Sequence, residues 1–171
     1  LFPEKVKGAV SLDACGPLTL EANTSQAQMR EAILSRKKKQ RNKLTLVNLD
    51  DAVKARCKVS DIPAEHARAI LERNLTQDAG GHCFWSSDPR LRTKSVLRLT
   101  EDQAENIMSA IVCPILFIGA SSSFKTLDSV YEKRQSWFKN ARFEQLTGGH
   151  HIHMEKTDDV GMLIRQFVEQ M

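Results

Sequence analysis

Three short apolar runs, separated by segments with helical patterns, constrain the fold of this chain most strongly. They are 6–12 (VKGAVSL), 115–119 (ILFIG, directly after a proline) and 141–146 (ARFEQL). Where short apolar strands alternate with helices, the strands pair in parallel and the helices cover the sheet. The pattern therefore predicts an α/β fold with parallel strands and flanking helices.

Caps and apolar periodicity mark the helices of this fold. Thr100 and Gln103 have the spacing of a capping box, and Pro63 stands at the start of another helical segment. Residues 82–99 are expected to be irregular or to form short β structure. The expected helices are one from Thr24 or Ser25 into a basic run, followed by 48–57, 63–75, 100–111, 127–139 and 157–170.

The segment between the first and second strands is unusually long. It has about ninety residues, which is far too many for a single crossover, so we expect it to form its own lobe over the strand ends. We therefore divide the chain into a core strand and turn at 1–19, a helical insertion at 20–111 and core strands and helices at 112–171.

The excess of basic residues has one source. The 171 residues include 25 Lys and Arg against 21 Asp and Glu, a net charge of +4, and six of the basic residues lie in 36–43 (RKKKQRNK). Without that run the count is 19 against 21. Because no aromatic residue lies within ten positions of the run, a solvated helix face is favoured over a nucleic-acid site, which stays a third, weaker hypothesis.

The apolar runs and the cysteine spacing indicate in which cellular compartment the protein is expected. The longest apolar stretch, 111–120, has ten residues, whereas a bilayer-spanning helix needs roughly 20. The first residues have the pattern of neither a signal peptide nor a transit peptide. The four cysteines form no CxxC pair, so neither zinc nor a disulfide scaffold is indicated, and we expect an intracellular, cytoplasmic protein with reduced thiols.

Chemically useful side chains follow two of the predicted strands. Asp13 comes directly after the first, and GGHHIHME (148–155) comes directly after the third. A histidine on a glycine-supported loop can act as a general base, and a carboxylate at a neighbouring strand end can orient it. The alternative is that Asp13 only caps a turn and the histidines lie on the surface. A metal site at His151 and His153 is weaker, because no further ligand has suitable spacing.

The same residues resemble the α/β-hydrolases. FPEKVKGAVSLDACGP is similar to the segment that follows the nucleophile helix in that family, and CPILFIGA and FEQLTGGHHIHMEKTDDVGMLIRQFVEQ are similar to its C-terminal strands, histidine loop and last helix. NLDDAVKAR and HCFWSSDPRLRTKSVLRLTEDQ resemble the helical cap of the serine hydrolase-like branch. The resemblance covers nearly all of the chain and makes 20–111 the cap of a hydrolase.

The resemblance also implies catalytic roles. Within GGHHIHMEK, the family places the catalytic histidine after Gly and five residues before an acidic or polar position, which selects His150 and matches that position to Glu155. The common acid position after ILFIG holds Ser, whereas other members carry the acid after the preceding strand, where this chain has Asp13. Asp128, further along, is the other candidate. The third possibility is that neither carboxylate is the catalytic acid.

The family's nucleophile motif, G-x-S-x-G, does not occur in these residues. The nearest approach, 119–123 (GASSS), lacks the second glycine and follows the wrong strand. The resemblance therefore implies that the chain is the cap and C-terminal core of a hydrolase, with the nucleophile on an N-terminal part outside it. We expect the isolated chain to be inactive and to need that part to cover its sheet.

The expected activity is hydrolysis of a small, ester-like acyl substrate by a Ser-His-Asp mechanism, with no cofactor and no metal. Phe84, Trp85 and Met108 are candidates for an apolar acyl pocket, although core packing is favoured as their role. Two other functional hypotheses stay open. One is a relative that uses an Asp nucleophile, such as a dehalogenase or epoxide hydrolase, and the other is a truncated, non-catalytic binding module.

Overall fold

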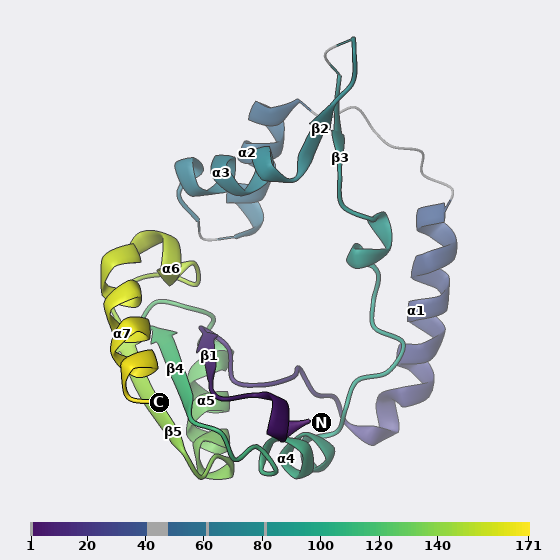
Figure 1. The fold of residues 1–171 in the computed structure, drawn as a ribbon. Helices are drawn as coiled ribbons and strands as arrows, with labels where there is room; N and C mark the ends of the chain where they lie inside the picture. The colour runs from purple at the N-terminus through teal and green to yellow at the C-terminus, as the bar shows by residue number, and fades with distance from the viewer. Residues whose placement is uncertain (1, 41–47, 61, 81) are drawn as a thin grey trace. The chain divides into compact units, whose positions relative to one another are not determined.

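The computed structural model describes residues 2–40, 48–60, 62–80 and 82–171, which form two compact units (Figure 1). Unit 1 comprises residues 1–19 and 99–171, and unit 2 comprises residues 20–98. The sequence placed the second boundary at residue 111. In the structure residues 99–111 group with unit 1, where Ala104 is fully buried in the core.

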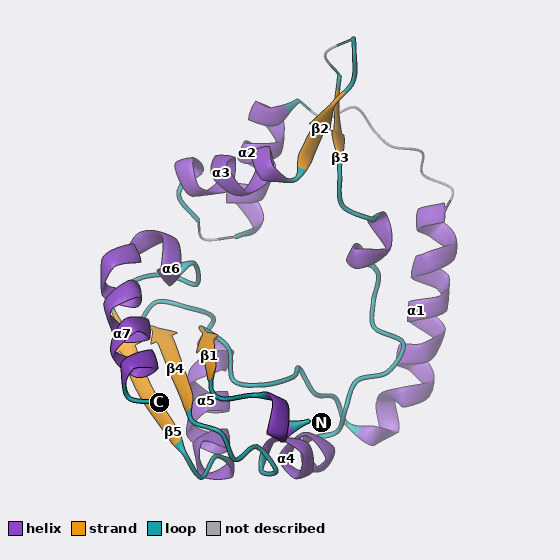
Figure 2. Cartoon of the chain, viewed as in Figure 1, coloured by secondary structure: helices purple, strands orange, loops and turns teal. Residues whose placement is uncertain are grey.

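Unit 1 is built on a parallel sheet of β1 (Ala9–Leu12), β4 (Ile115–Ala120) and β5 (Ala141–Leu146), in the order β1-β4-β5 (Figure 2). Ala9 lies opposite Ile115, which in turn lies opposite Ala141. The expectation of a parallel sheet flanked by helices is therefore confirmed. The carboxyl ends of all three strands lie at one edge of this sheet.

Four helices belong to unit 1: α4 (Glu101–Met108), α5 (Lys125–Arg134), α6 (Ile152–Glu155) and α7 (Thr157–Glu169). The capping box expected at the start of α4 is present, with the Thr100 side chain accepting from the Gln103 N–H. The helix expected at 127–139 begins at 125 and ends at 134, and a 3-10 turn (Gln135–Trp137) continues it. The short helix α6 was not predicted.

Alternate residues of β4 point into two apolar layers. Leu116, Ile118 and Ala120 pack with residues of α6 and α7, namely Ile152, Val160, Leu163 and Phe167. Ile115 and Phe117 face the other layer, with Cys15, Ala104, Trp137 and Phe138. The continuous apolar run of β4 follows from this burial on both faces.

A buried guanidinium ties three segments of unit 1 together. Arg134, at the end of α5, is only 3% exposed. Its Nε and Nη2 donate to the two carboxylate oxygens of Glu101 at 2.8 and 2.9 Å, and its Nη1 donates to the carbonyls of Cys15 and Pro17 at 2.7 and 2.9 Å. The segment after β1 is thereby held against α4 and α5.

The carboxylate of Glu101 is stabilised from several sides. Besides the bonds from Arg134, its Oε2 accepts the hydroxyl of Thr19 at 2.6 Å, and Lys133 Nζ lies 3.7 Å from its Oε1. The hydrogen bonds from Arg134, followed by that from Thr19, lower the pKa of Glu101 to about 2. The carboxylate consequently stays ionised down to strongly acidic pH.

Unit 2 contains α1 (Ser25–Gln40), α2 (Leu49–Val59), α3 (Ala64–Arg73) and an antiparallel pair, β2 (Leu75–Gln77) and β3 (Cys83–Trp85). Its core consists of Val53, Ile62, Ala67 and Leu71, with Trp85 packed against it. The helix expected over 63–75 ends at Arg73, because the Asn74 side chain donates to the Ile70 carbonyl and the chain turns into β2.

Two further expectations concern the exposure of the basic run and the presence of a membrane-spanning helix. Within the basic run, Arg36 and Lys37 are exposed on α1, whereas 41–43 lie outside the described residues. Among the helices that the structure describes, none is long and apolar enough to cross a membrane.

Replacing Glu101 with Gln should remove an acid-dependent part of the stability of unit 1. Because the pKa of Glu101 is lowered in the folded state, its contribution is fully present above the ordinary value of 4.5 and is lost as the pH falls through about 2. A shift of this size corresponds to about 3 kcal/mol. Urea unfolding of both proteins at several pH values between 2 and 7 measures the difference.

The matched control is Asp102→Asn, which changes the neighbouring, exposed carboxylate in the first turn of α4. It should lower stability by at most about 1 kcal/mol. At neutral pH, Glu101→Gln should cost about 3–5 kcal/mol, because it leaves Arg134 buried without its counter-charge. Equal pH profiles for wild type and Glu101→Gln would contradict the assignment.

Candidate active site

The carboxyl ends of the three parallel strands bring the predicted site residues to one edge of the sheet. Asp13 follows β1 directly, 121–123 follow β4, and His150 lies four residues beyond the end of β5. The loops after β4 and β5 are joined by backbone bonds from Ser121 N–H to the Leu146 carbonyl and from Ser122 N–H to the Gly148 carbonyl, both at 2.9 Å. The histidine loop is therefore held beside the other two.

The structure pairs His150 with Asp13. Nδ1 of His150 lies 2.5 Å from Oδ2 of Asp13, although the two residues are 137 positions apart in the sequence. The Asp13 residue is 2% exposed, whereas 41% of the His150 side chain is exposed. The carboxylate is therefore a buried group that one edge of the imidazole covers, while the rest of the ring reaches solvent.

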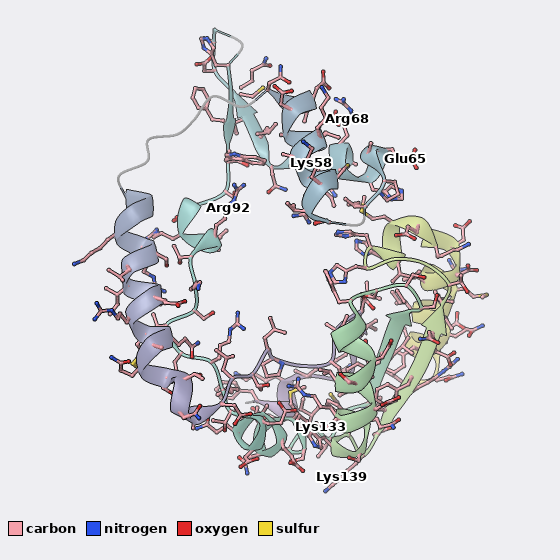
Figure 3. All side chains as sticks on the ribbon, turned by 180° about the vertical axis from the view of Figure 1, so that it is seen from behind. Lys58, Glu65, Arg68, Arg92, Lys133 and Lys139 are labelled. Carbon is pink, nitrogen blue, oxygen red and sulfur yellow. The ribbon has the colours of Figure 1, made fainter. Side chains whose placement is uncertain are left out.

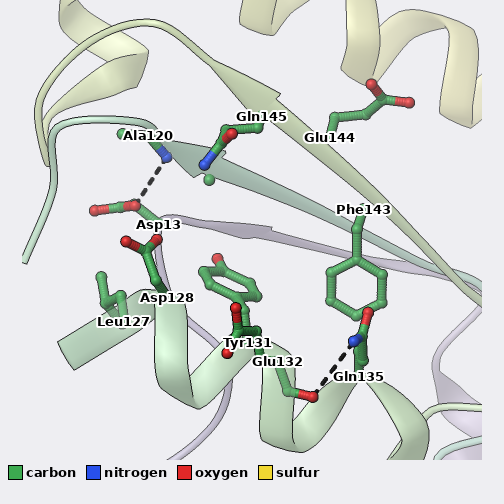
Figure 4. A pocket seen from close by; sticks show the side chains of 11 residues that line it. Asp13, Ala120, Leu127, Asp128, Tyr131, Glu132, Gln135, Phe143, Glu144 and Gln145 are labelled. Atoms are coloured by element: carbon green, nitrogen blue, oxygen red, sulfur yellow. Dashed lines mark hydrogen bonds between the residues drawn. The ribbon is translucent and has the colours of Figure 1, made fainter. Parts of the chain in front are cut away.

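The buried carboxylate has partners on both oxygens. Oδ1 of Asp13 accepts the backbone N–H of Ala120 at 3.0 Å (Figure 4), and Oδ2 accepts the hydroxyl of Ser123. With His150, three groups contact the carboxylate, from the end of β4 and from the loops after β4 and β5. Both oxygens of this buried group therefore have hydrogen-bond partners in place of water.

The backbone at Asp13 is unusual. Its φ of +47° is the only positive value at a non-glycine position among the described residues, and Asp tolerates this left-handed conformation better than most side chains. Its N–H donates to the Ile118 carbonyl at 2.7 Å. The strand therefore turns sharply at Asp13, which directs the carboxylate across the end of β4.

The segment after Asp13 is anchored by its carbonyls. The carbonyl of Ala14 accepts the hydroxyls of Ser11 at 2.8 Å and Tyr131 at 3.1 Å, and Arg134 binds the next carbonyls as described above. Burial raises the pKa of the Cys15 thiol to about 11, despite the opposing charge of Arg134. Burial also raises the pKa of Tyr131. Both groups therefore stay protonated and neutral beside the site.

The glycines before His150 make room for Glu155. The N–H of Gly149 donates to Oε2 of Glu155 at 2.9 Å, which closes the loop onto the end of α6. A Cβ on Gly149 would lie 2.8 Å from Oε1 of Glu155, and one on Gly148 would lie 2.5 Å from Cδ1 of the fully buried Ile152. The spacing of glycines, histidine and acid in GGHHIHME thus has a local structural cause.

Other rings surround His150. The ring centroids of the exposed Phe124 and of His151 lie 4.7 and 5.2 Å from the centroid of His150. His151 and His153 have ring centroids 6.0 Å apart. In the part of the chain that the structure describes, no group of three or more His, Cys, Asp or Glu side chains is arranged to hold a metal ion.

The contacts at this edge of the sheet distinguish Asp13 from the rival acid and from the serine run. Asp128 is exposed in the first turn of α5, and it is Asp13 that contacts the Nδ1 atom of His150. Of the serines in 121–123, Ser123 binds the carboxylate of Asp13. These contacts leave Asp13 as the carboxylate partner of the histidine, and they give Ser123 a role in holding the acid.

The three candidates for an acyl pocket are divided between the units. Met108 packs against the core of unit 1, whereas Phe84 and Trp85 are half-buried on β3 of unit 2. Trp85 also packs against the core of unit 2. A joint acyl pocket made by these residues therefore stays a prediction.

A hollow of about 410 Å³ lies between α5 and the ends of β4 and β5 (Figure 4). Tyr131 and Phe143 form an aromatic wall with their rings edge to face at 6.1 Å. The other lining residues are mostly polar or acidic: Asp13, Gly119, Ala120, Leu127, Asp128, Glu132, Gln135, Glu144 and Gln145. This hollow reaches the site from the side of the acid.

Three residues of the site were not predicted: Ser123, Tyr131 and Arg134. Ser123 had a signal, because it lies in the loop whose usual acidic position holds serine. Arg134 and Tyr131 had none, since each contacts a carbonyl of the Asp13 loop from more than 110 positions away in the sequence.

The sequence is similar to curated proteins that carry a serine hydrolase-like name. It is 28% identical to a serine hydrolase-like protein of Danio rerio over 99% of this chain, and 27% identical to one of Dictyostelium discoideum over 98%. The matches cover 55% and 50% of those proteins, so the chain spans about half the length of the curated relatives it matches. No protein-family model matches the chain.

Several solved structures share the fold. A hypothetical protein of Pseudomonas aeruginosa PAO1 is 27% identical with a TM-score of 0.75, over 89% of this chain and 54% of its own. The thioesterase domain from the curacin biosynthetic pathway is 18% identical with a TM-score of 0.71, over 96% and 59%. An esterase from Mycobacterium tuberculosis is 16% identical with a TM-score of 0.54, over 98% and 56%. At these lower identities the likeness concerns the fold alone.

Replacing Gly148 with Ala should destabilise the histidine loop. The new methyl group would lie 2.5 Å from Ile152 Cδ1, and because Ile152 is fully buried it has little room to move, so we expect a loss of about 1–3 kcal/mol. Urea unfolding followed by circular dichroism measures the change in the free energy of unfolding.

Gly161→Ala is the control, because nothing lies within 4 Å of a Cβ built at this position in α7. This substitution should raise the free energy of unfolding by about 0.5–1 kcal/mol. Equal effects of the two substitutions would refute the packing argument.

Proposed function

We propose that the chain, which has an α/β-hydrolase-like fold and relatives named serine hydrolase-like, supplies the histidine and the acid of a serine hydrolase that acts on ester-like acyl substrates. The contact of 2.5 Å between His150 Nδ1 and Asp13 Oδ2 at the carboxyl edge of the parallel sheet carries the proposal. Ligands of open α/β sheets bind at this edge.

Each atom of the pair then has a definite role. With its proton on Nδ1, His150 donates to Asp13 and keeps the lone pair on Nε2, which faces away from the acid. Nε2 accepts the proton of an attacking serine and later returns it to the leaving group. Asp13 fixes this tautomer and stabilises the imidazolium as it forms. The hydrogen bonds from Ala120 and Ser123 hold the carboxylate in place beside the imidazole.

We place the nucleophile and the oxyanion donors outside these 171 residues, because they contain no G-x-S-x-G elbow. Two observations support this placement. The chain spans about half the length of its curated relatives, and β1 pairs only with β4 among the described strands. The other edge of β1 leaves backbone groups unpaired beside exposed Val6 and Val10, which suits pairing with a further strand of the same fold.

Two other functions would use the same fold differently. An Asp nucleophile in place of the serine would give a dehalogenase or an epoxide hydrolase, which the His150–Asp13 pair would serve equally well. A non-catalytic binding module would not need the pair at all. The Asp13 carboxylate is buried and has three hydrogen-bond partners. This favours catalysis over the binding module, because burying such a polar group costs free energy of folding. No step of the proposed reaction needs a metal or a cofactor.

The 171-residue chain alone should not hydrolyse p-nitrophenyl acetate above the rate of buffer. Without a serine nucleophile and oxyanion donors, His150 has no group to activate. The His150→Ala variant should give the same background rate. Turnover that His150→Ala abolishes would show that the nucleophile lies within these residues.

In the longer protein that includes the remaining strands, a fluorophosphonate probe should label one serine of the preceding segment. Asp13→Asn should then lower kcat by about 10⁴-fold, as an amide stabilises the wrong histidine tautomer. Asp128→Asn tests the rival acid and should leave kcat unchanged. A larger loss of kcat in Asp128→Asn than in Asp13→Asn would overturn the assignment of the acid. If no serine is labelled and a haloalkane instead alkylates an aspartate with release of halide, the dehalogenase class would be favoured.

A further inference from the structure

We propose that unit 2 carries a binding site for an apolar chain that ends in a carboxylate. The site is a cavity of about 640 Å³, which lies within the range of cavities that bind small organic molecules. All its lining residues belong to unit 2, so the proposal is independent of the hydrolytic function proposed above.

The walls of the cavity are mainly apolar. Val59 on α2, Ile70 and Leu71 on α3 and Trp85 on β3 provide large side chains, and Ala52 and Ala55 of α2 leave space between them. Contact with these side chains removes part of a hydrocarbon chain from water, which is the main source of affinity for such ligands.

The charged groups of the lining all have one sign. Arg56 and Arg92 line the cavity, and no Asp or Glu does. The guanidinium of Arg92 also covers the ring of Trp85, with Cζ 4.4 Å from the ring centroid. Figure 3 shows Arg92 on its 3-10 turn beside this part of unit 2. Planar guanidinium groups bind carboxylates through paired hydrogen bonds, so an anionic end group fits this lining.

Arg56 has an unmet hydrogen-bonding requirement. Its Nε atom is buried, and none of the residues that the structure describes accepts its proton. Other arginines of unit 2 have carboxylate partners: Arg68 is paired with Asp50, and Arg90 with Asp88, each at 2.5 Å. A buried donor without an acceptor is uncommon, and a ligand carboxylate in the cavity would supply the missing acceptor. Asn74 also lines the cavity, but its side-chain amide already donates to the Ile70 carbonyl.

Isothermal titration calorimetry of the chain with octanoate tests the site at neutral pH, where this probe is ionised. Octanoate should bind saturably. Octan-1-ol, which lacks the charge, and acetate, which lacks the chain, should each bind at least tenfold more weakly. Octan-1-ol that binds as tightly as octanoate would overturn the proposal that the site recognises a carboxylate. Absence of saturable octanoate binding would overturn the proposal of a binding site.

Two substitutions separate the contributions of charge and space. Arg56→Gln should weaken octanoate binding by about ten- to a hundredfold and leave octan-1-ol unaffected, because it removes the charged donor alone. Ala55→Leu should weaken both probes, since it fills the apolar cavity. Lys58→Gln is the matched control: it removes a positive charge from an exposed position of the same helix, outside the cavity lining, and should change neither affinity (Figure 3).

Circular dichroism establishes that each variant is folded. If Arg56→Gln unfolds, Arg92→Gln replaces it, because Arg92 is exposed on its 3-10 turn and its removal leaves no cavity in a core. Octanoate affinity that is unchanged by the folded Arg variant, or that falls equally in Lys58→Gln, would show that binding is not made by this cavity.

Discussion

The contact of Arg134 with Glu101 and with the carbonyls after β1 is the interaction on which the remainder of unit 1 depends. A guanidinium that is 3% exposed has lost nearly all of its water, and only a full set of acceptors makes this tolerable. The acceptors come from α4 and from the segment that follows Asp13. Satisfying one buried charge thus requires three distant parts of the sequence to meet in a single geometry.

A second buried charge, that of Asp13, benefits from this geometry. Its hydrogen-bond partners come from the end of β4 and from the loops after β4 and β5, so the carboxylate connects the ends of all three strands. The anchored carbonyls on one side of Asp13 and the sheet on the other leave its backbone little freedom. Both charges are held by groups that were in place before any substrate arrives, which is the general requirement for electrostatic catalysis.

Sequence reasoning found the strands, the order of the helices and the two strand ends that meet, because apolar periodicity and parallel topology are local and geometric properties. It could not find the partners of Arg134, which depend on how separate elements pack. It also extended the third helix through Leu75, where the side chain of Asn74 ends the helix and β2 begins. The pairing of Asp13 with His150 could be anticipated, whereas the contacts of Tyr131 and Arg134 with the carbonyls after Asp13 left no signal in the sequence.

The left-handed backbone at Asp13 links two properties that are usually independent. In most sites the residue that bears the charge and the residue that makes the turn are different, and each can be exchanged alone. Here one side chain must accept a φ of +47° and also carry the carboxylate. The range of amino acids that can occupy this position is therefore narrower than either the chemistry or the turn would require separately.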